Sequence, residues 1–244
     1  MPTRQLHIEG VVQGVGFRPH VYRLANQHQL KGWVSNDVTG VHIEVTGSDG
    51  DLARFESELL AHPPLHSRIS RVQHKEIPEV DYVTFQIIES NSNGEPSVLL
   101  TPDMGLCKDC RHEITEPGNR RQGYPFTTCL KCGPRYSIIQ GLPYDRPLTT
   151  MARFTMCPTC GKEYHDPSDR RFYSQTNSCP DCAVQLSLVT PDGKVLSTSA
   201  STIVEQAIAM FRQGAILGVK GIGGYFLRTG AIVGTYPAGS APNG

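Results

Sequence analysis

Apolar side chains in the first 90 residues recur with two different periods. Residues 4–11 and 41–46 alternate apolar with polar positions, which predicts two half-buried strands. Apolar positions recur at helical spacing around Pro19, which suits a first helical residue, and again over residues 51–61. The pattern therefore predicts strands and helices that share one core.

Three further strands complete this region. One ends at the turn signal Asn36–Asp37, and residues 69–76 and 84–88 supply the others. The element order is β-α-β-β-α-β, that of the ferredoxin-like sandwich, in which two helices cover one face of an antiparallel sheet. We assign this α+β domain to residues 1–90.

The rest of the chain has a different character. Residues 101–190 are poor in apolar periodicity and rich in Cys, Gly, Pro and Arg, so they need a source of stability other than a large core. A helix is predicted around residues 203–211 and an apolar strand over residues 215–219. We therefore expect a small middle domain and a third, α/β domain over residues 198–244.

Charge and compartment narrow the classes of function. Lys plus Arg and Asp plus Glu both number 23, which does not favour binding to nucleic acid. The N-terminus lacks the apolar core of a secretory signal, and no apolar run is long enough to span a membrane, so we expect a cytoplasmic protein. Because that compartment keeps thiols reduced, the eight cysteines point to metal binding.

The cysteines form two copies of the pattern C-x2-C-x18-C-x2-C. The first copy comprises Cys107, Cys110, Cys129 and Cys132, and the second comprises Cys157, Cys160, Cys179 and Cys182. Glutamate, proline and arginine residues also match at an offset of 50, as in Glu113 with Glu163 and Arg120 with Arg170. The pattern predicts a duplicated module with two closed, structural Zn²⁺ sites.

Other uses of these cysteines are less favoured. Disulfides are rare in a reducing compartment, and four C-x2-C pairs exceed the needs of one redox centre. We expect each repeat to hold its own metal ion, although spacing alone also allows ligands to be shared between the repeats. Zinc binding would supply the folding free energy that this segment lacks.

A glycine-rich loop joins the first strand to the first helix and comprises Gln13, Gly14, Val15, Gly16 and Phe17, followed by Arg18. Glycines let backbone N–H groups converge on an anion, and the helix N-terminus and an arginine fork favour phosphate. A simple tight turn is the alternative.

Together with the segment Gly32-Trp33-Val34-Ser35-Asn36, this loop resembles acylphosphatase. The resemblance covers about the first 90 residues and implies that Arg18 binds the phosphate while Asn36 positions the attacking water. Such a pairing suits an acyl phosphate, which needs charge neutralisation and an oriented water more than a strong base. His7, His20 and His28 are assigned no role.

The order of modules resembles one family, the HypF carbamoyltransferases that mature nickel–iron hydrogenases. The resemblance runs from about Leu6 to Leu227 and includes the stretches 132–136, 143–147 and 219–224. It implies that carbamoyl phosphate is cleaved at the acylphosphatase-like site. In the full-length protein it further implies ATP-dependent formation of a carbamoyl adenylate and transfer to the partner HypE.

The last part of the chain resembles the start of the family's YrdC-like domain. The residues that this resemblance offers to a nucleotide are Lys220, Gly221, Gly223 and Gly224, and a strand with a flexible turn is the alternative. After Leu227 the sequence leaves the family pattern, which suggests a truncated or frame-shifted reading frame. We therefore expect hydrolysis, but not full carbamoyl transfer, from this fragment.

Two rival functions stay open. A stand-alone acylphosphatase with a zinc-binding appendage would turn over generic acyl phosphates. The second rival is a zinc-finger module that binds nucleic acid or protein. It is favoured by the pairs Arg120–Arg121 and Arg170–Arg171, which could contact phosphates.

Overall fold

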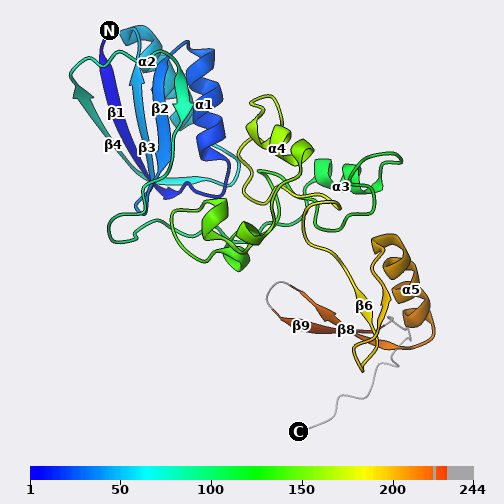
Figure 1. Cartoon of the computed structure of the whole chain (residues 1–244). Coiled ribbons are helices and arrows are strands. Elements are labelled where there is room, and N and C mark those ends of the chain that lie inside the picture. Colours follow the sequence, from blue (N-terminus) through cyan, green and yellow to red (C-terminus); the bar gives the residue numbers. More distant parts are fainter. Residues whose placement is uncertain (222–223, 230–244) are drawn as a thin grey trace, which may run out of the picture. The chain divides into compact units, whose positions relative to one another are not determined.

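The computed structural model describes residues 1–221 and 224–229. The chain divides into two compact units, Met1–Val184 and a second unit that starts at Gln185. The predicted first domain and the predicted middle domain up to Val184 fall within the first unit. Figure 1 shows the helices and strands of each unit.

The first unit opens with a five-stranded sheet. Its elements are β1 (Thr3–Val11), α1 (Phe17–Gln27), β2 (Lys31–Asn36), β3 (Val41–Thr46), α2 (Asp49–Ala61), β4 (Arg68–Ile77) and β5 (Phe85–Ile87). The strand order is β4-β1-β3-β2-β5. The first four strands pair antiparallel, which is the predicted ferredoxin-like arrangement, whereas β5 pairs parallel to β2 at the edge.

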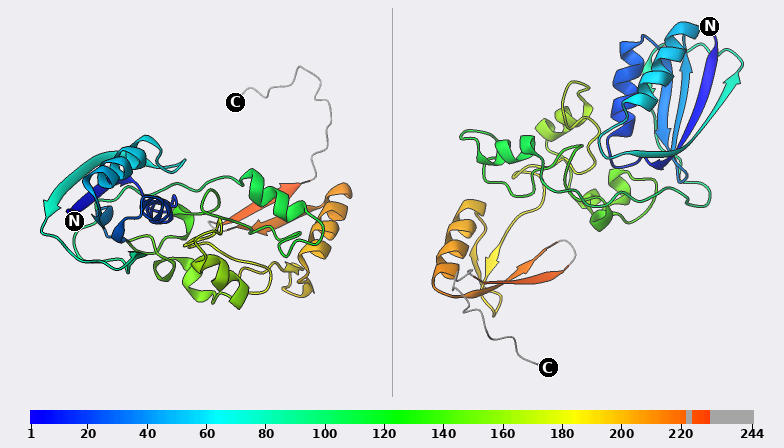
Figure 2. Two further views of the ribbon diagram at one scale, coloured as in Figure 1. Left: turned by 90° about the horizontal axis from the view of Figure 1, so that it is seen from above. Right: turned by 180° about the vertical axis from the view of Figure 1, so that it is seen from behind.

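Helices α1 and α2 cover one face of this sheet (Figure 2). Their apolar stripes and the inward positions of the strands form one core, in which Ile8, Val34 and Phe55 are fully buried. Helix α1 begins at Phe17, two residues before the predicted start at Pro19, because the proline fits anywhere in a first turn.

Gly32 shows why β2 needs a glycine beside β3. Its φ is +136°, and a Cβ at this position would lie 1.9 Å from the carbonyl oxygen of Glu44. Only glycine fits this close approach between strands. The approach holds β2, and therefore Asn36 at its end, in register with β3.

The middle region of the first unit has little regular structure. Its helices are α3 (Lys108–Thr115) and α4 (Pro158–His165), with short 3-10 helices η1 (Tyr136–Ile138), η2 (Arg146–Leu148) and η3 (Thr150–Arg153). Helices α3 and α4 begin and end 50 residues apart, as a duplicated module requires. Cys107 and Cys157 cap their N-termini, so each helix starts at a cysteine of its cluster.

The second unit contains a small hairpin, a helix and a second hairpin. Its elements are β6 (Leu188–Val189), β7 (Val195–Ser197), α5 (Ala200–Arg212), β8 (Ile216–Lys220) and β9 (Tyr225–Thr229). Helix α5 and strand β8 match the predicted helix and strand. The predicted divergent tail falls largely on residues 230–244, which lie outside the described residues.

Candidate active site

The loop between β1 and α1 contains a run of backbone N–H groups without hydrogen-bond partners among the described residues. Gly14 and Gly16 have φ values of 73° and 80°, a region that favours glycine. Among the described residues, no group accepts a hydrogen bond from the backbone N–H of any residue in the stretch 14–18. With the N-terminus of α1 behind them, these five free donors form a cradle for an anion such as phosphate.

Arg18 and Asn36 lie together at this cradle. Arg18 stands in the first turn of α1 and Asn36 at the end of β2, and both are almost fully buried. The side-chain oxygen of Asn36 accepts hydrogen bonds from Arg18 Nε at 3.1 Å and from Nη2 at 3.2 Å. This orientation of the amide is assigned because the opposite one would place the NH₂ group of Asn36 against the N–H groups of Arg18. The fold thus brings the two predicted residues into direct contact.

The zinc-finger region reaches into the same site. Arg18 Nη2 lies 2.5 Å from Asp145 Oδ1 and 3.5 Å from the carbonyl oxygen of Tyr144. Its Nη1 donates to Ser90 Oγ at 3.1 Å. Three residues outside the strands and helices of the acylphosphatase-like domain therefore fix the orientation of this guanidinium.

Gln13 uses its side chain to hold the loop rather than to face the cradle. Its amide nitrogen donates to the carbonyl oxygens of Asp37, at 2.6 Å, and Gly40, at 2.9 Å. Its amide oxygen accepts from the backbone N–H of Tyr144 at 2.8 Å. Gln13 thereby ties the loop to the β2–β3 turn and to the finger region.

Arg135 is a site residue that the sequence did not single out. The side chain is 3% exposed and donates to the backbone carbonyl of Gly14 in the loop. It also donates to the carbonyls of Cys129, at 3.0 Å, and Cys132, at 3.1 Å. The arginine of the stretch Cys132-Gly133-Pro134-Arg135-Tyr136 therefore links the first cysteine cluster to the cradle.

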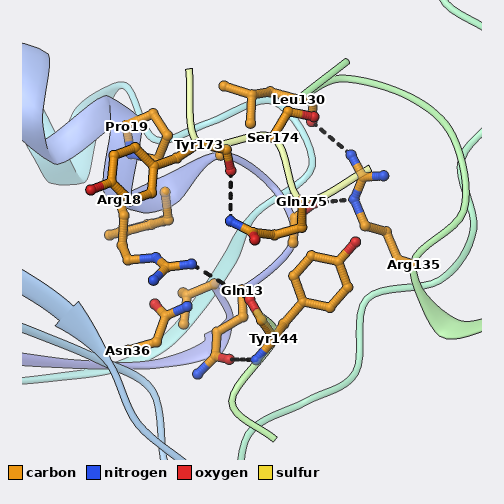
Figure 3. Close-up of a pocket in the computed structure, with 14 residues that line it drawn as sticks. Gln13, Arg18, Pro19, Asn36, Leu130, Arg135, Tyr144, Tyr173, Ser174 and Gln175 are labelled. Atoms are coloured by element: carbon orange, nitrogen blue, oxygen red, sulfur yellow. Dashed lines mark hydrogen bonds between the residues drawn. The ribbon is translucent and has the colours of Figure 1, made fainter. Parts of the chain in front are cut away.

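A small cavity of about 20 Å³ lies between the cradle and the finger region (Figure 3). Gly14, Arg18 and Asn36 line it on one side, and Tyr144 and Ser174 line it on the other. Among the described residues, the buried hydroxyls of Tyr144 and Ser174 have no hydrogen-bond partner. Unpaired buried hydroxyls are costly, so these two are available to a ligand in the cavity.

A larger cavity of about 510 Å³ adjoins the small one. Arg18, Tyr173 and Gln175 line both, so they form the wall between the two cavities. Asp145 and Ser90 line the larger cavity beside this wall. As it stands, the small cavity has room for about one water molecule, whereas the larger one has room for a substrate-sized group beside Arg18.

The cysteines gather in two separate clusters, one in each repeat. The Sγ atoms of a cluster all lie within 4.8 Å of one another. Recorded Sγ–Sγ separations are 3.5 to 3.9 Å in the first cluster and 3.6 to 3.8 Å in the second. Tetrahedral zinc with Zn–S bonds of about 2.3 Å spaces its sulfurs about 3.8 Å apart, so both clusters fit zinc.

An arginine of each repeat contacts the cysteine cluster of the other repeat. Arg170 Nη2 donates to Cys110 Sγ at 3.2 Å, and Arg120 Nη2 donates to Cys160 Sγ at 3.3 Å. The same arginines pair with glutamates of the opposite repeat, Arg170 with Glu113 at 2.6 Å and Arg120 with Glu163 at 2.7 Å. Two positive side chains thus offset the negative charge of the two four-thiolate sites.

The neighbouring arginines, Arg121 and Arg171, pair with the same two glutamates. Arg121 and Arg171 are 2% exposed and bind Glu163 and Glu113. Although burial opposes ionisation, the hydrogen bond and charge of Arg121 hold the pKa of Glu163 at about 2. The arginine pairs that supported a nucleic-acid interface are therefore committed to contacts inside the protein.

The predicted nucleotide residues lie at the β8–β9 hairpin. Lys220 Nζ stands 4.8 Å from the centre of the Tyr225 ring, and the N–H of Gly221 donates to the carbonyl of Gly224 at 2.7 Å. Gly223 lies outside the described residues. A nucleotide-binding role for these residues stays a prediction.

Two family models match the chain. The model described as acylphosphatase matches residues 4–87. The model described as HypF finger matches twice, at residues 106–139 and 156–189. The first match covers the cradle with Arg18 and Asn36, and each of the other two covers one cysteine cluster.

Known proteins resemble the chain over the same regions. The carbamoyltransferase HypF of Rhodobacter capsulatus is 44% identical over 232 residues, which are 93% of this chain and 30% of that protein. The acylphosphatase of Leuconostoc mesenteroides subsp. mesenteroides is 41% identical over 88 residues, which are 36% of this chain and 98% of that protein.

A solved structure agrees with these relatives. The crystal structure of full-length HypF in the phosphate- and nucleotide-bound form matches with a TM-score of 0.83 and 41% identity, over 93% of this chain and 29% of that one. The chain thus spans about 30% of the length of the HypF relatives that it matches. It belongs to the HypF family, whose N-terminal part it matches, and it carries an acylphosphatase domain and two HypF fingers.

Proposed function

We propose that the first unit hydrolyses an acyl phosphate, carbamoyl phosphate, at the cradle formed by residues 14–18. The observation that carries this proposal is the contact of Arg18 with Asn36 beside five unpaired backbone N–H groups. This arrangement supplies charge neutralisation for the phosphate and an amide that can orient water.

Each group has a defined part in the proposed reaction. The loop N–H groups and Arg18 bind the phosphate oxygens, and Asn36 holds a water in line with the bond to the acyl oxygen. The water oxygen forms a bond to phosphorus as the bond between phosphorus and the acyl oxygen breaks. The products are phosphate and carbamate, and the proton of the water passes to solvent or to the phosphate.

The finger region is expected to act as architecture in this reaction. Four thiolates leave no open position on a tetrahedral metal ion, so bound zinc would supply folding free energy rather than chemistry. Its contribution to the site is indirect, because Arg135 and Tyr144 join the clusters and their loops to the cradle.

Further steps are proposed for a protein of the relatives' full length. There, the carbamate would react with ATP to form a carbamoyl adenylate, and the carbamoyl group would pass to HypE during hydrogenase maturation. We place these steps in the cytoplasm. In the part of the chain that the structure describes, no helix has the length and apolar character needed to cross a bilayer.

Phosphate release tests the proposed substrate. The zinc-loaded chain is assayed with carbamoyl phosphate and with acetyl phosphate, beside the variants Arg18→Ala and Asn36→Ala. We expect turnover that favours carbamoyl phosphate and is lost in both variants. Equal turnover of the two substrates would instead favour a generic acylphosphatase, and no turnover of either by folded protein would contradict the proposal.

A further inference from the structure

Two histidines face each other on the sheet surface that α1 and α2 leave uncovered. His7 on β1 and His42 on β3 are direct partners in the antiparallel register. Their rings stack with centroids 4.1 Å apart and planes 10° from parallel. Side chains of Leu6 and Ile8 point into the core, so His7 lies on the opposite face, partly open to solvent.

A carboxylate from the β2–β3 turn joins the pair. Asp37 Oδ2 lies 2.7 Å from His42 Nε2. Asp37 Oδ1 is held separately, because it accepts from the backbone N–H groups of Thr39, at 2.7 Å, and Gly40, at 2.8 Å. One oxygen therefore fixes the turn, while the other contacts the imidazole of His42.

We propose that His7, His42 and Asp37 form a binding site for a divalent transition-metal ion, distinct from the cysteine clusters. One ligand atom from each residue lies within 4.8 Å of the others. Two imidazoles and a carboxylate are ligands that Zn²⁺ accepts, and three protein ligands leave a position for water.

The surroundings resemble the outer shell of a metal site. Glu9 Oε1 lies 3.8 Å from His7 Nδ1, and the Thr39 hydroxyl lies 3.0 Å from His7 Nε2. A carboxylate at one ring nitrogen orients a histidine so that its other nitrogen faces the metal. The ring nitrogen that would bind the ion contacts Thr39 in His7 and Asp37 in His42, and the ion would replace the Thr39 contact.

Ion binding requires a small rearrangement of the rings. Nearly parallel imidazoles direct their lone pairs along parallel lines, so each ring must turn about its Cβ–Cγ bond to face a shared ion. Ligand nitrogens on tetrahedral zinc lie about 3.3 Å apart. Both side chains are partly exposed, at 22% for His7 and 34% for His42, which leaves room for this turn.

Calorimetric titration with Zn²⁺ tests the site. The untagged chain, already loaded with zinc at both cysteine clusters, is titrated further, and ring nitrogen shifts of the histidines are followed by NMR. We expect one additional equivalent, with affinity lowered at least about tenfold in His42→Ala and in Asp37→Asn. Asparagine can still accept the Thr39 and Gly40 hydrogen bonds, so the second variant keeps the turn.

His74→Ala is the matched control, because this histidine is exposed on the neighbouring strand β4. It should bind the extra ion as the parent does, with shifts confined to His7 and His42. Absence of an additional equivalent in the parent chain overturns the proposal. Undiminished binding in both His42→Ala and Asp37→Asn overturns it as well.

Discussion

The Arg18 guanidinium lies 2.5 Å from the Asp145 carboxylate, a contact between residues 127 positions apart. The arginine belongs to the cradle, and the aspartate belongs to the loop before η2 in the finger region. A carboxylate at one edge of a guanidinium fixes the plane of the whole fork. The finger region therefore orients the group that we expect to bind phosphate.

Asp145→Ala is predicted to lower kcat/KM for carbamoyl phosphate about tenfold. Arg18 keeps its contacts with Asn36 and Ser90 but loses the charged partner that holds its plane. Steady-state kinetics should show the loss mainly in kcat, and Asp145→Glu should restore part of it. Asp81→Ala, at an exposed position, should change neither constant. Unchanged kcat in a zinc-loaded Asp145→Ala protein would refute the positioning role.

The unpaired hydroxyls of the cavity give a second prediction. Ser174→Ala should weaken inhibition by inorganic phosphate about fivefold, because the unpaired hydroxyl of this cavity-lining residue would no longer be able to donate to the anion. Stability should not fall, since the hydroxyl has no partner among the described residues. Inhibition assays and thermal unfolding check both statements. Ser168→Ala, on an exposed turn, serves as the control.

The arginine contacts between the repeats predict that a substitution in one repeat weakens zinc binding in the other. Arg170→Ala should speed zinc loss from the first cluster, because its donor to Cys110 is gone, although the arginine belongs to the second repeat. Arg120→Ala should speed loss from the second cluster through Cys160. Chelator competition with cadmium-113 NMR of the substituted protein assigns each site.

Arg111→Ala is the control for this experiment, because Arg111 is exposed on α3. It should leave both release rates unchanged. Faster loss from the cluster in the same repeat as the substituted arginine would contradict the crossed arrangement.

Tyr124 predicts a stability loss at high pH. Burial raises the pKa of Tyr124 to about 12, and its hydroxyl donates to the carbonyl of Val184 at 3.1 Å. The folded protein therefore favours the neutral phenol more than the unfolded chain does. This contribution is present below pH 10, the ordinary tyrosine value, and is lost as the pH rises from 10 to 12.

Denaturant unfolding at several pH values measures how the free energy of unfolding changes with pH. Tyr124→Phe should be less stable by about 1 kcal/mol at neutral pH. Between pH 10 and 12 its free energy of unfolding should fall less steeply with pH than that of the parent, because the variant lacks this titrating group. Identical slopes in the parent and the variant would show that another group is responsible.

The glycine-rich strand-to-helix turn drew attention to Arg18 as an anion-binding residue. Asn36 was predicted only through the resemblance to acylphosphatase, because no local pattern gives a single asparagine at the end of a strand a role. Asp145 and Arg135 could not be found in this way, because they approach the cradle only when the finger region folds against it. The spacing of apolar residues along the chain does not predict a contact between two separate regions.

The short finger helices escaped prediction for a related reason. Helices α3 and α4 have eight residues each, and only one side chain of each is buried, the cysteine at 110 or 160. An apolar stripe is the signal for a helix, and these helices are held by cysteine ligands instead. His7 was assigned no role because its neighbour His42 becomes visible only once the register of β1 and β3 is known.

The division of labour between Arg18 and Asn36 is tested most directly by measuring kcat and the inhibition constant of inorganic phosphate together. Asn36→Ala should lower kcat at least about a hundredfold with little change in phosphate inhibition, because water is misplaced while the anion cradle stays intact. Arg18→Ala should weaken phosphate inhibition at least about tenfold as well as abolish turnover. Retained turnover in a folded Asn36→Ala protein, or undiminished phosphate inhibition in Arg18→Ala, would contradict the account.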